Sequence, residues 1–108
     1  MTEIFWFELE NETIGYIKYL QRQDHVFIEL IVIYKAKRGH GYSKMMFDQF
    51  VDLFPASKIE LVAREDTDRY DKLFGLYRSW GFREVGKTSY HSDNDSSYRE
   101  CLFRRLPV

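Results

Sequence analysis

The sequence predicts an α+β fold in which two helices pack on a mixed, mostly antiparallel central sheet. Strand-like runs come in neighbouring groups at both ends of the chain, and two segments with apolar residues at helical spacing lie between them. The resulting order is β-β-β-α-β-α-β-β. Neighbouring strands joined by short turns pair antiparallel, whereas strands separated by a helix need a parallel crossover, so the sheet is expected to contain both arrangements.

The first three strands are predicted from runs of aromatic and β-branched residues. "IFWFELE" and "TIGYIKYLQ" are separated by a turn-forming "NE", which is typical of a hairpin. After the polar turn "QRQD", the segment from His25 to Tyr34 is nearly continuous in apolar residues. Such a run is expected of a central strand that is covered on both faces.

The first helix follows a glycine-containing loop and ends before Pro55, which cannot continue a helix. A short strand, "KIELVA", comes next. In the second helix, Tyr70, Leu73, Phe74 and Tyr77 form one apolar stripe that ends at Gly81.

The cap of the second helix and the last two strands complete the predicted elements. Asp66, Thr67 and Asp68 offer a capping side chain and an acidic first turn for that helix. The final two strands are expected from about Arg83 to Tyr90 and from Ser97 to Arg105, on either side of the polar loop "HSDNDSS".

Length and charge limit the classes of function. A chain of 108 residues is expected to form a single domain, residues 1–108. Its net charge of −1 gives no overall attraction to nucleic acid or to an anionic membrane. We expect a cytoplasmic protein, because the N-terminus does not resemble a signal peptide and no run reaches the length of a membrane span.

The sequence predicts no metal site. Cys101 is the single cysteine, which excludes an internal disulfide and a cysteine-based metal site, and it is expected inside the last strand. His25, His40 and His91 lack the spacing of a shared metal site.

The loop "YKAKRGHGYS" carries the first chemical prediction. It gathers cations, among them Lys37 and Arg38, where a helix begins, although a helix N-terminus disfavours positive charge. Gly39 and Gly41 allow positive φ and bring backbone N–H groups close to an anion such as a diphosphate. An ordinary turn with solvated cations is the alternative. The spacing fits neither a P-loop nor a dinucleotide fingerprint, in which Lys44 would have to be glycine.

Two motifs carry a resemblance to a known family. "IVIYKAKRGHGYSKMM" resembles the acetyl-CoA loop of the GNAT superfamily of N-acyltransferases, with the pattern [QR]-x-x-G-x-[GA] on residues 38–43. Ser43 departs from the usual Gly or Ala, but it is small and is expected to cap the helix. "YRSWGF", from Tyr77 to Phe82, matches the family's Y-x-x-x-G-F signature. The chain resembles a minimal member without the usual N-terminal strand and helices.

The resemblance implies acetyl-CoA as cosubstrate, with no metal. In such enzymes the sheet splays open beside the strand that precedes the loop, and the pantetheine arm hydrogen-bonds to that strand, here at Ile31, Val32 and Ile33. The diphosphate would lie on the loop and the helix start, formed by Arg38, Gly39, His40, Gly41, Tyr42, Ser43 and Lys44.

Two residues are candidates for proton transfer, because the attacking amine must be neutral and the departing thiolate gains from an acid. Glu29, the ionisable residue within "VFIELIVI", is the candidate general base. A Glu on a solvent-facing pleat is the alternative. The resemblance aligns Tyr77 with the family tyrosine near the CoA sulfur and makes it the candidate acid. A core aromatic residue is its alternative role.

The predicted function is transfer of an acetyl group from acetyl-CoA to a primary amine through a ternary complex. Without the usual N-terminal helices, the acceptor side is expected to be open, which suits a protein or peptide amine better than an enclosed small amine. A homodimer that completes the wall is a further expectation, with "FWF" as its surface. A core strand is the alternative role of "FWF". The alternatives are a catalytically silent CoA-binding or protein-interaction module, and a nucleotide-binding module.

Overall fold

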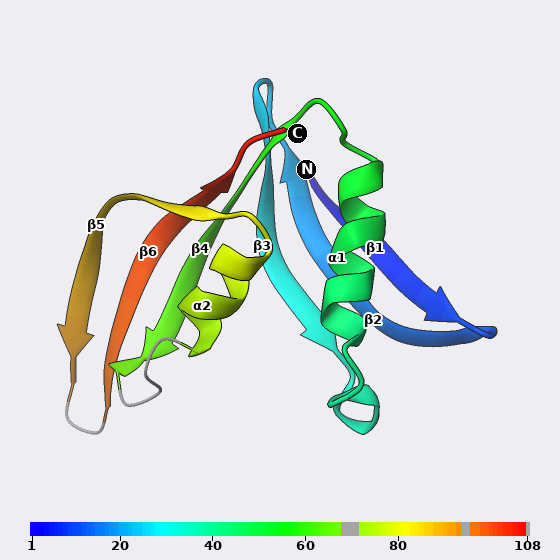
Figure 1. Cartoon of the computed structure of the whole chain (residues 1–108), viewed down its shortest axis with the longest axis horizontal. Helices are drawn as coiled ribbons and strands as arrows, with labels where there is room; N and C mark the ends of the chain where they lie inside the picture. Colours follow the sequence, from blue (N-terminus) through cyan, green and yellow to red (C-terminus); the bar gives the residue numbers. More distant parts are fainter. Residues whose placement is uncertain (68–71, 94–95, 108) are drawn as a thin grey trace.

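The computed structural model describes residues 1–67, 72–93 and 96–107 of the chain (Figure 1). Its first three strands are followed by a short 3₁₀ helix: β1 (Thr2–Leu9), β2 (Glu12–Gln21), β3 (His25–Ile33) and η1 (Lys35–Lys37). Helices and strands then alternate before a final hairpin: α1 (Tyr42–Asp52), β4 (Lys58–Asp66), α2 (Lys72–Ser79), β5 (Arg83–Ser92) and β6 (Ser97–Arg105). The predicted order of strands and helices is confirmed.

The strands form one sheet in the order β1-β2-β3-β4-β6-β5. Neighbours pair antiparallel except β3 and β4, which are parallel and are joined through α1. The predicted mixed, mostly antiparallel sheet is therefore confirmed. The crossover places the glycine loop at the end of β3, beside the gap that opens between β3 and β4 (Figure 1).

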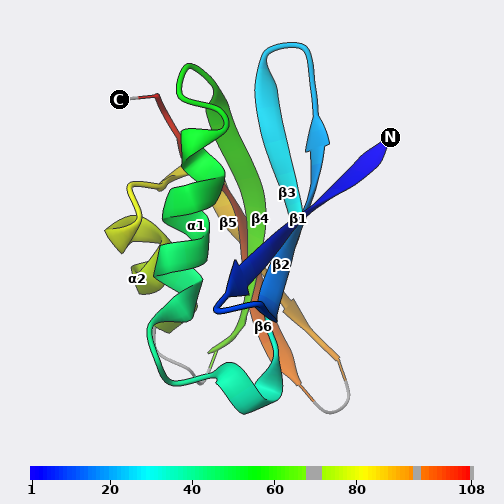
Figure 2. The same cartoon turned by 90° about the vertical axis from the view of Figure 1, so that its right-hand side faces the viewer.

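Both helices lie on the same face of the sheet (Figure 2). Helix α1 covers β2 through Phe50, whose ring lies 5.0 Å from the ring of Tyr19. Helix α2 covers β6 through Phe74, whose ring lies 5.0 Å from that of Phe103. Large rings fill the core, and its fully buried aromatic members are Phe7, Phe47, Phe50, Phe74, Phe82 and Phe103.

Two elements differ from the expectations. Strand β4 continues to Asp66, so that residue ends a strand and does not begin a helix. The described part of α2 begins at Lys72, and Asp68 and Tyr70 lie outside the described residues. The segment Lys35–Lys37, expected as loop, forms η1, which contains no buried residue. Cys101 is buried in β6, as expected.

Gly15 is required where β2 passes close to β3. A Cβ atom at this position would lie 2.1 Å from the carbonyl oxygen of Val32. Both atoms belong to rigid strands, so a methyl group cannot be accommodated by a side-chain rotation. The close approach keeps the last part of β3 attached to β2 after β3 has left β4.

We predict that Gly15→Ala lowers the free energy of unfolding by at least about 2 kcal/mol, because β2 and β3 must separate to relieve the overlap. Gly75→Ala is the matched control. Gly75 lies inside α2, and a Cβ atom added there would meet no atom within 4 Å, so the substitution should raise stability by about 0.5–1 kcal/mol. Urea denaturation of the two variants measures both effects, and equal stabilities would contradict the prediction.

Candidate active site

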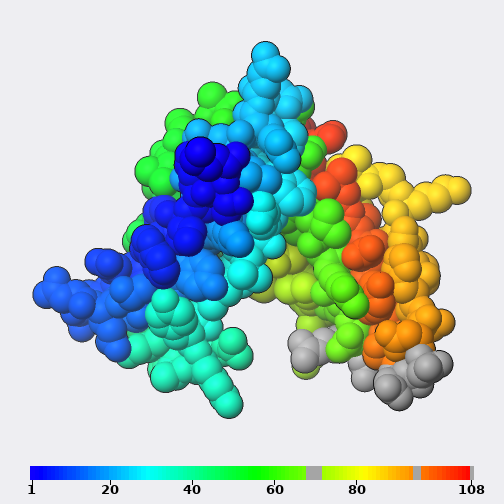
Figure 3. Space-filling model, turned by 180° about the vertical axis from the view of Figure 1, so that it is seen from behind, coloured from blue at the N-terminus to red at the C-terminus, as the bar shows by residue number. Residues whose placement is uncertain are grey.

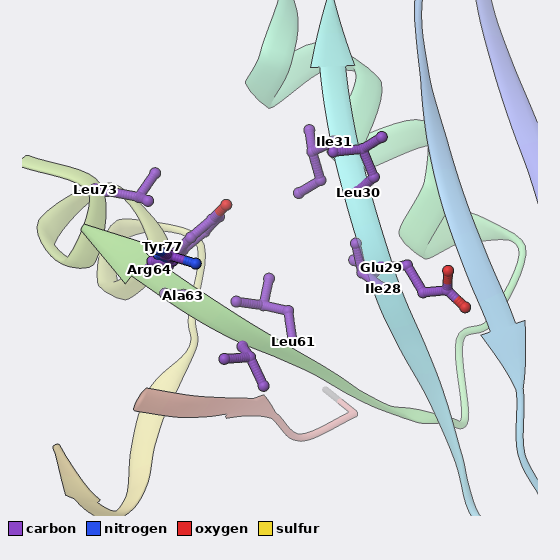
Figure 4. A pocket seen from close by; sticks show the side chains of 10 residues that line it. Ile28, Glu29, Leu30, Ile31, Leu61, Ala63, Arg64, Leu73 and Tyr77 are labelled. Carbon is purple, nitrogen blue, oxygen red and sulfur yellow. The ribbon is translucent and has the colours of Figure 1, made fainter. Parts of the chain in front are cut away.

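A cleft opens where β3 and β4 part. The two strands pair over four residues only, from His25↔Lys58 to Ile28↔Leu61. Beyond Ile28, β3 continues to pair with β2. Beyond Leu61, β4 continues to pair with β6. The cleft has a volume of about 200 Å³ and is lined from β3, β4 and α2 (Figure 4). The sheet is therefore splayed at the place where the resemblance implied it.

A β-bulge at Glu29 marks the start of the divergence. Tyr19 pairs with Ile28 and Lys18 pairs with Leu30, so Glu29 is the extra residue on β3. A bulge bends its strand and increases the local twist. Here it turns β3 away from β4 at the residue that follows the last pair between them.

The edge of β3 that faces β4 is the expected site for the pantetheine arm. Gly15↔Ile33, Tyr16↔Val32 and Ile17↔Ile31 pair this part of β3 with β2 on one side. Its other side has no strand partner among the described residues and borders the cleft, which Ile31 lines. Backbone N–H and C=O groups along that edge are available to a ligand with its own amide groups.

Tyr77 extends from α2 into this cleft, and Figure 4 shows its hydroxyl group pointing into the gap toward β3. Its ring contacts the core, with Trp80 at 5.5 Å and Phe103 at 6.0 Å between ring centroids. The ring therefore packs in the core, as the alternative role predicted, while the hydroxyl faces the cleft. Burial raises the pKa of the phenol above its usual value of 10.0, so the hydroxyl, already protonated at neutral pH, keeps its proton to a higher pH.

Glu29 also borders the cleft, but its carboxylate does not meet Tyr77. The side chain is exposed and accepts a hydrogen bond from Thr2 Oγ1 at 3.4 Å. Figure 4 shows it on the side of β3 that faces away from Tyr77. The position corresponds to the solvent-facing Glu that was the alternative to a buried base.

The glycine loop has the backbone geometry expected for anion binding. Gly39 and Gly41 have φ values of 85° and 75°, and a Cβ at either would meet no atom within 4 Å. Gly41 is the N-cap of α1, and no side chain caps the helix. The expectation that Ser43 caps it is wrong, because Ser43 already lies inside the first turn. The first N–H groups of α1 therefore have no helical partner and face outward.

The cations around this loop are held in different ways. Arg38 Nε donates to the carbonyl oxygen of Ile33 at 3.0 Å, which ties the loop to the end of β3. Lys37 pairs with Glu12 at 2.7 Å, and Lys44 pairs with Asp48 one turn further along α1. The remaining basic residues, Lys35 and His40, are exposed, and the His40 ring lies 5.4 Å from the ring of Tyr42.

A buried ion pair that was not predicted from the sequence holds α2. Glu65 is 3% exposed and accepts a hydrogen bond from Arg99 Nη2 at 2.8 Å and another from the backbone N–H of Leu73. Arg99 in turn lies 4.0 Å above the ring of Phe74. The alternation of the strand could have predicted the burial of Glu65, because Glu65 follows Ala63 by two residues and therefore lies on the same buried face of β4. The pair anchors α2 and hence Tyr77.

Comparison with known proteins identifies the family. The model of the acetyltransferase (GNAT) family matches residues 2–82. The chain belongs to the GNAT family. No curated protein matches it. Neither described helix is long and apolar enough to cross a membrane, and no group of three metal-ligating side chains occurs among the described residues.

Solved structures of GNAT acetyltransferases share the fold. A protein from Bacteroides thetaiotaomicron assigned to the GNAT family superposes with a TM-score of 0.78 at 18% identity, over 99% of this chain and 62% of that one. The ribosomal-protein-S18-alanine N-acetyltransferase from Escherichia coli gives 0.77 at 12% identity, over 99% and 70%. NAA60 from Arabidopsis thaliana, in complex with a bisubstrate analogue, gives 0.63 at 18%, over 90% and 67%. This GNAT chain thus spans about two thirds of their lengths.

The environment of Tyr77 predicts how it titrates. Because burial raises its pKa, the folded protein holds this proton at a pH where the unfolded chain has lost it. The contribution of the protonated Tyr77 to the free energy of unfolding is fully present below pH 10. It is lost as the pH rises through the pKa of Tyr77 in the folded protein. In a spectroscopic titration of tyrosinate, Tyr77→Phe should remove a group that ionises above the exposed tyrosines. Loss of an early-titrating group instead would contradict this assignment.

Proposed function

We propose that this GNAT protein transfers an acetyl group from acetyl-CoA to the primary amine of a protein or peptide. The observation that carries the proposal is the arrangement of three features around one cleft. These are the glycine loop at the start of α1, the unpaired edge of β3, and the hydroxyl of Tyr77. Each supplies what one part of an acyl-CoA thioester requires.

The chain's own groups fit the two ends of the cosubstrate. The N–H groups from Arg38 to Lys44, with the cations beside them, suit a diphosphate at a helix start. The free edge of Ile31, Val32 and Ile33 suits the amides of a pantetheine arm running into the cleft. Acetyl-CoA supplies the activated acyl group, and the protein supplies its position.

Tyr77 is the proposed general acid. When the amine nitrogen bonds to the acetyl carbon, the carbon–sulfur bond breaks and a thiolate leaves. The Tyr77 hydroxyl, which is protonated at neutral pH and whose pKa burial raises further, donates its proton to that sulfur. The anchored position of α2, set by Glu65 and Arg99, holds the hydroxyl at the cleft.

Glu29 is the proposed general base, with a longer path to the amine. Its carboxylate lies at the cleft margin but is turned toward Thr2, so it would receive the amine proton through a water molecule or after a side-chain rotation. Glu29→Gln tests this part separately. A decrease in kcat supports the base role, whereas unchanged turnover assigns the amine proton to solvent.

An open cleft favours a macromolecular acceptor. The face of the sheet opposite the helices carries no described covering element, and Figure 3 shows a hollow between the arm of β1, β2 and β3 and the arm of β4, β5 and β6. A surface that is open in this way exposes the cleft to a chain end or a side chain of another protein. Among the structural neighbours, the Escherichia coli enzyme is named for a protein substrate.

A catalytically silent CoA-binding module is the second candidate function. It is favoured by the orientation of Glu29, whose carboxylate is directed away from Tyr77. Normal binding of acetyl-CoA, without CoA release in the presence of peptides or a proteome extract, would identify this function.

We predict that Tyr77→Phe lowers kcat by about 100-fold or more, because the leaving thiolate loses its proton donor. The KM for acetyl-CoA should change little, since the ring and its core contacts remain. Tyr90→Phe is the control, because Tyr90 is 69% exposed and does not line the cleft. CoA release measured with a thiol reagent gives both constants. An active Tyr77→Phe variant would refute the role of the hydroxyl.

We predict that Arg38→Glu weakens acetyl-CoA binding by about 1.5–3 kcal/mol, and by more where repulsion is added, because a cation beside the diphosphate becomes an anion. Arg22→Glu reverses an exposed charge at the far end of β2 and β3, and it should bind normally. Isothermal titration calorimetry with acetyl-CoA compares the two variants. Equal affinities would remove the glycine loop from the cosubstrate site.

A further inference from the structure

No described element covers the sheet face opposite α1 and α2 (Figure 2), and several large apolar side chains on that face are exposed. We call it the open face. Exposed on it are Ile4 at 45%, Trp6 at 52%, Leu30 at 45%, Tyr34 at 38% and Val62 at 50%. A group of exposed apolar residues of this kind marks an interaction surface more often than it marks a solvated one.

The aromatic members of the open face form one continuous group. Trp6 pairs with Tyr16 across β1 and β2, and their rings lie 5.3 Å apart. The ring of Tyr16 lies 6.3 Å from that of Tyr34, which follows the end of β3. The group therefore crosses all three strands of the arm that borders the cleft.

Two opposite charges stand in the middle of this surface. Lys18 pairs with Ile4 of β1 and with Leu30 of β3, so the three residues lie at one height across the arm. Glu29 is the bulged residue next to Leu30. Among the described residues, Lys18 and Glu29 form no salt bridge with each other or with another charged side chain, and Glu29 accepts a hydrogen bond only from Thr2 Oγ1.

We propose that two copies of the chain associate through their open faces, with Lys18 of each copy paired with Glu29 of the other. A two-fold axis parallel to the strands, between β2 and β3, brings each Lys18 opposite Glu29 and satisfies both charges twice. An ionised Glu29 is also the form that accepts a proton, so the pair is compatible with its proposed base role.

The same symmetry places the other copy over the cleft. Because the axis lies between β2 and β3, β2 of one copy faces β3 of the other. Strands are about 4.8 Å apart, so β1 of that copy lies one strand beyond β3, at the place from which β4 has diverged. Ile4 of the other copy then lies at the height of Leu30, next to Val62, and its Trp6 lies over the cleft mouth. Each copy would supply a wall of the acceptor site of the other, a consequence that rests on the proposed function.

The size of the surface predicts a weak, reversible dimer. Three strands of 8 to 10 residues present a face of about 14 Å by 30 Å, or about 400 Å² per copy. This is about half of the area per partner in a standard interface, so the association is expected to be weak and to depend on concentration.

Sedimentation velocity over a micromolar to millimolar series tests the dimer without cosubstrate or amine, so its outcome is independent of transferase activity. Lys18→Glu and Glu29→Lys should each weaken association at least about tenfold, because like charges then face each other. The double variant should restore it. Lys72→Glu, a charge reversal on α2, is the control and should leave association unchanged. A monomer throughout, or a dimer that ignores the charge reversals, overturns the proposal.

Cross-linking tests the register. Two proteins, one with Ile4→Cys and one with Val62→Cys, should form a mixed disulfide under mild oxidation, because the proposed dimer places these two positions side by side. The native Cys101 is 3% exposed and does not compete. Leu53→Cys replaces Ile4→Cys in the control, because Leu53 is 55% exposed at the end of α1 on the helical face. Equal cross-linking of both pairs overturns the register.

Discussion

The short parallel contact between β3 and β4 is the constraint on which the structure depends. Four residue pairs join the two arms of the sheet, and beyond them each strand follows its antiparallel neighbour. Side chains strengthen this closed end, where Glu60 accepts from Arg104 at 2.6 Å and lies 3.5 Å from His25. Since the arms are joined at one end only, the backbone groups of β3 at the other end have no strand partner among the described residues. They are therefore available to hydrogen-bond to a ligand.

Two local features turn this open end into a site. The bulge at Glu29 directs β3 away from β4, and the positive φ values of Gly39 and Gly41 let the chain enter α1 with its first amides exposed. Tyr77 completes the cleft from the opposite arm. Its position depends on Glu65, a buried carboxylate that binds the first described turn of α2 and Arg99 of β6. A residue outside the cleft thus sets the position of the proposed acid.

Both helices cover one face of the sheet, and the consequence is an exposed apolar surface on the other. The side chains of Trp6, Tyr16 and Tyr34 pack on one another within that surface, so they are partly ordered before any partner arrives. An interface assembled from such pre-positioned rings loses less side-chain entropy on association. The open face and the cleft share β3 as a border. The proposed dimer would therefore also affect how an acceptor reaches the cleft.

Local patterns determined the number, order and type of the elements, because alternation along β4 and the helical spacing of Phe47, Phe50 and Phe54 are properties of neighbours in sequence. The paired glycines and the motif from Tyr77 to Phe82 likewise determined the family. Burial and orientation were decided only by the tertiary structure. The exposed Glu29, turned toward Thr2, and the buried Glu65, paired with Arg99, are both carboxylates in strands, and only contacts between distant strands distinguish them.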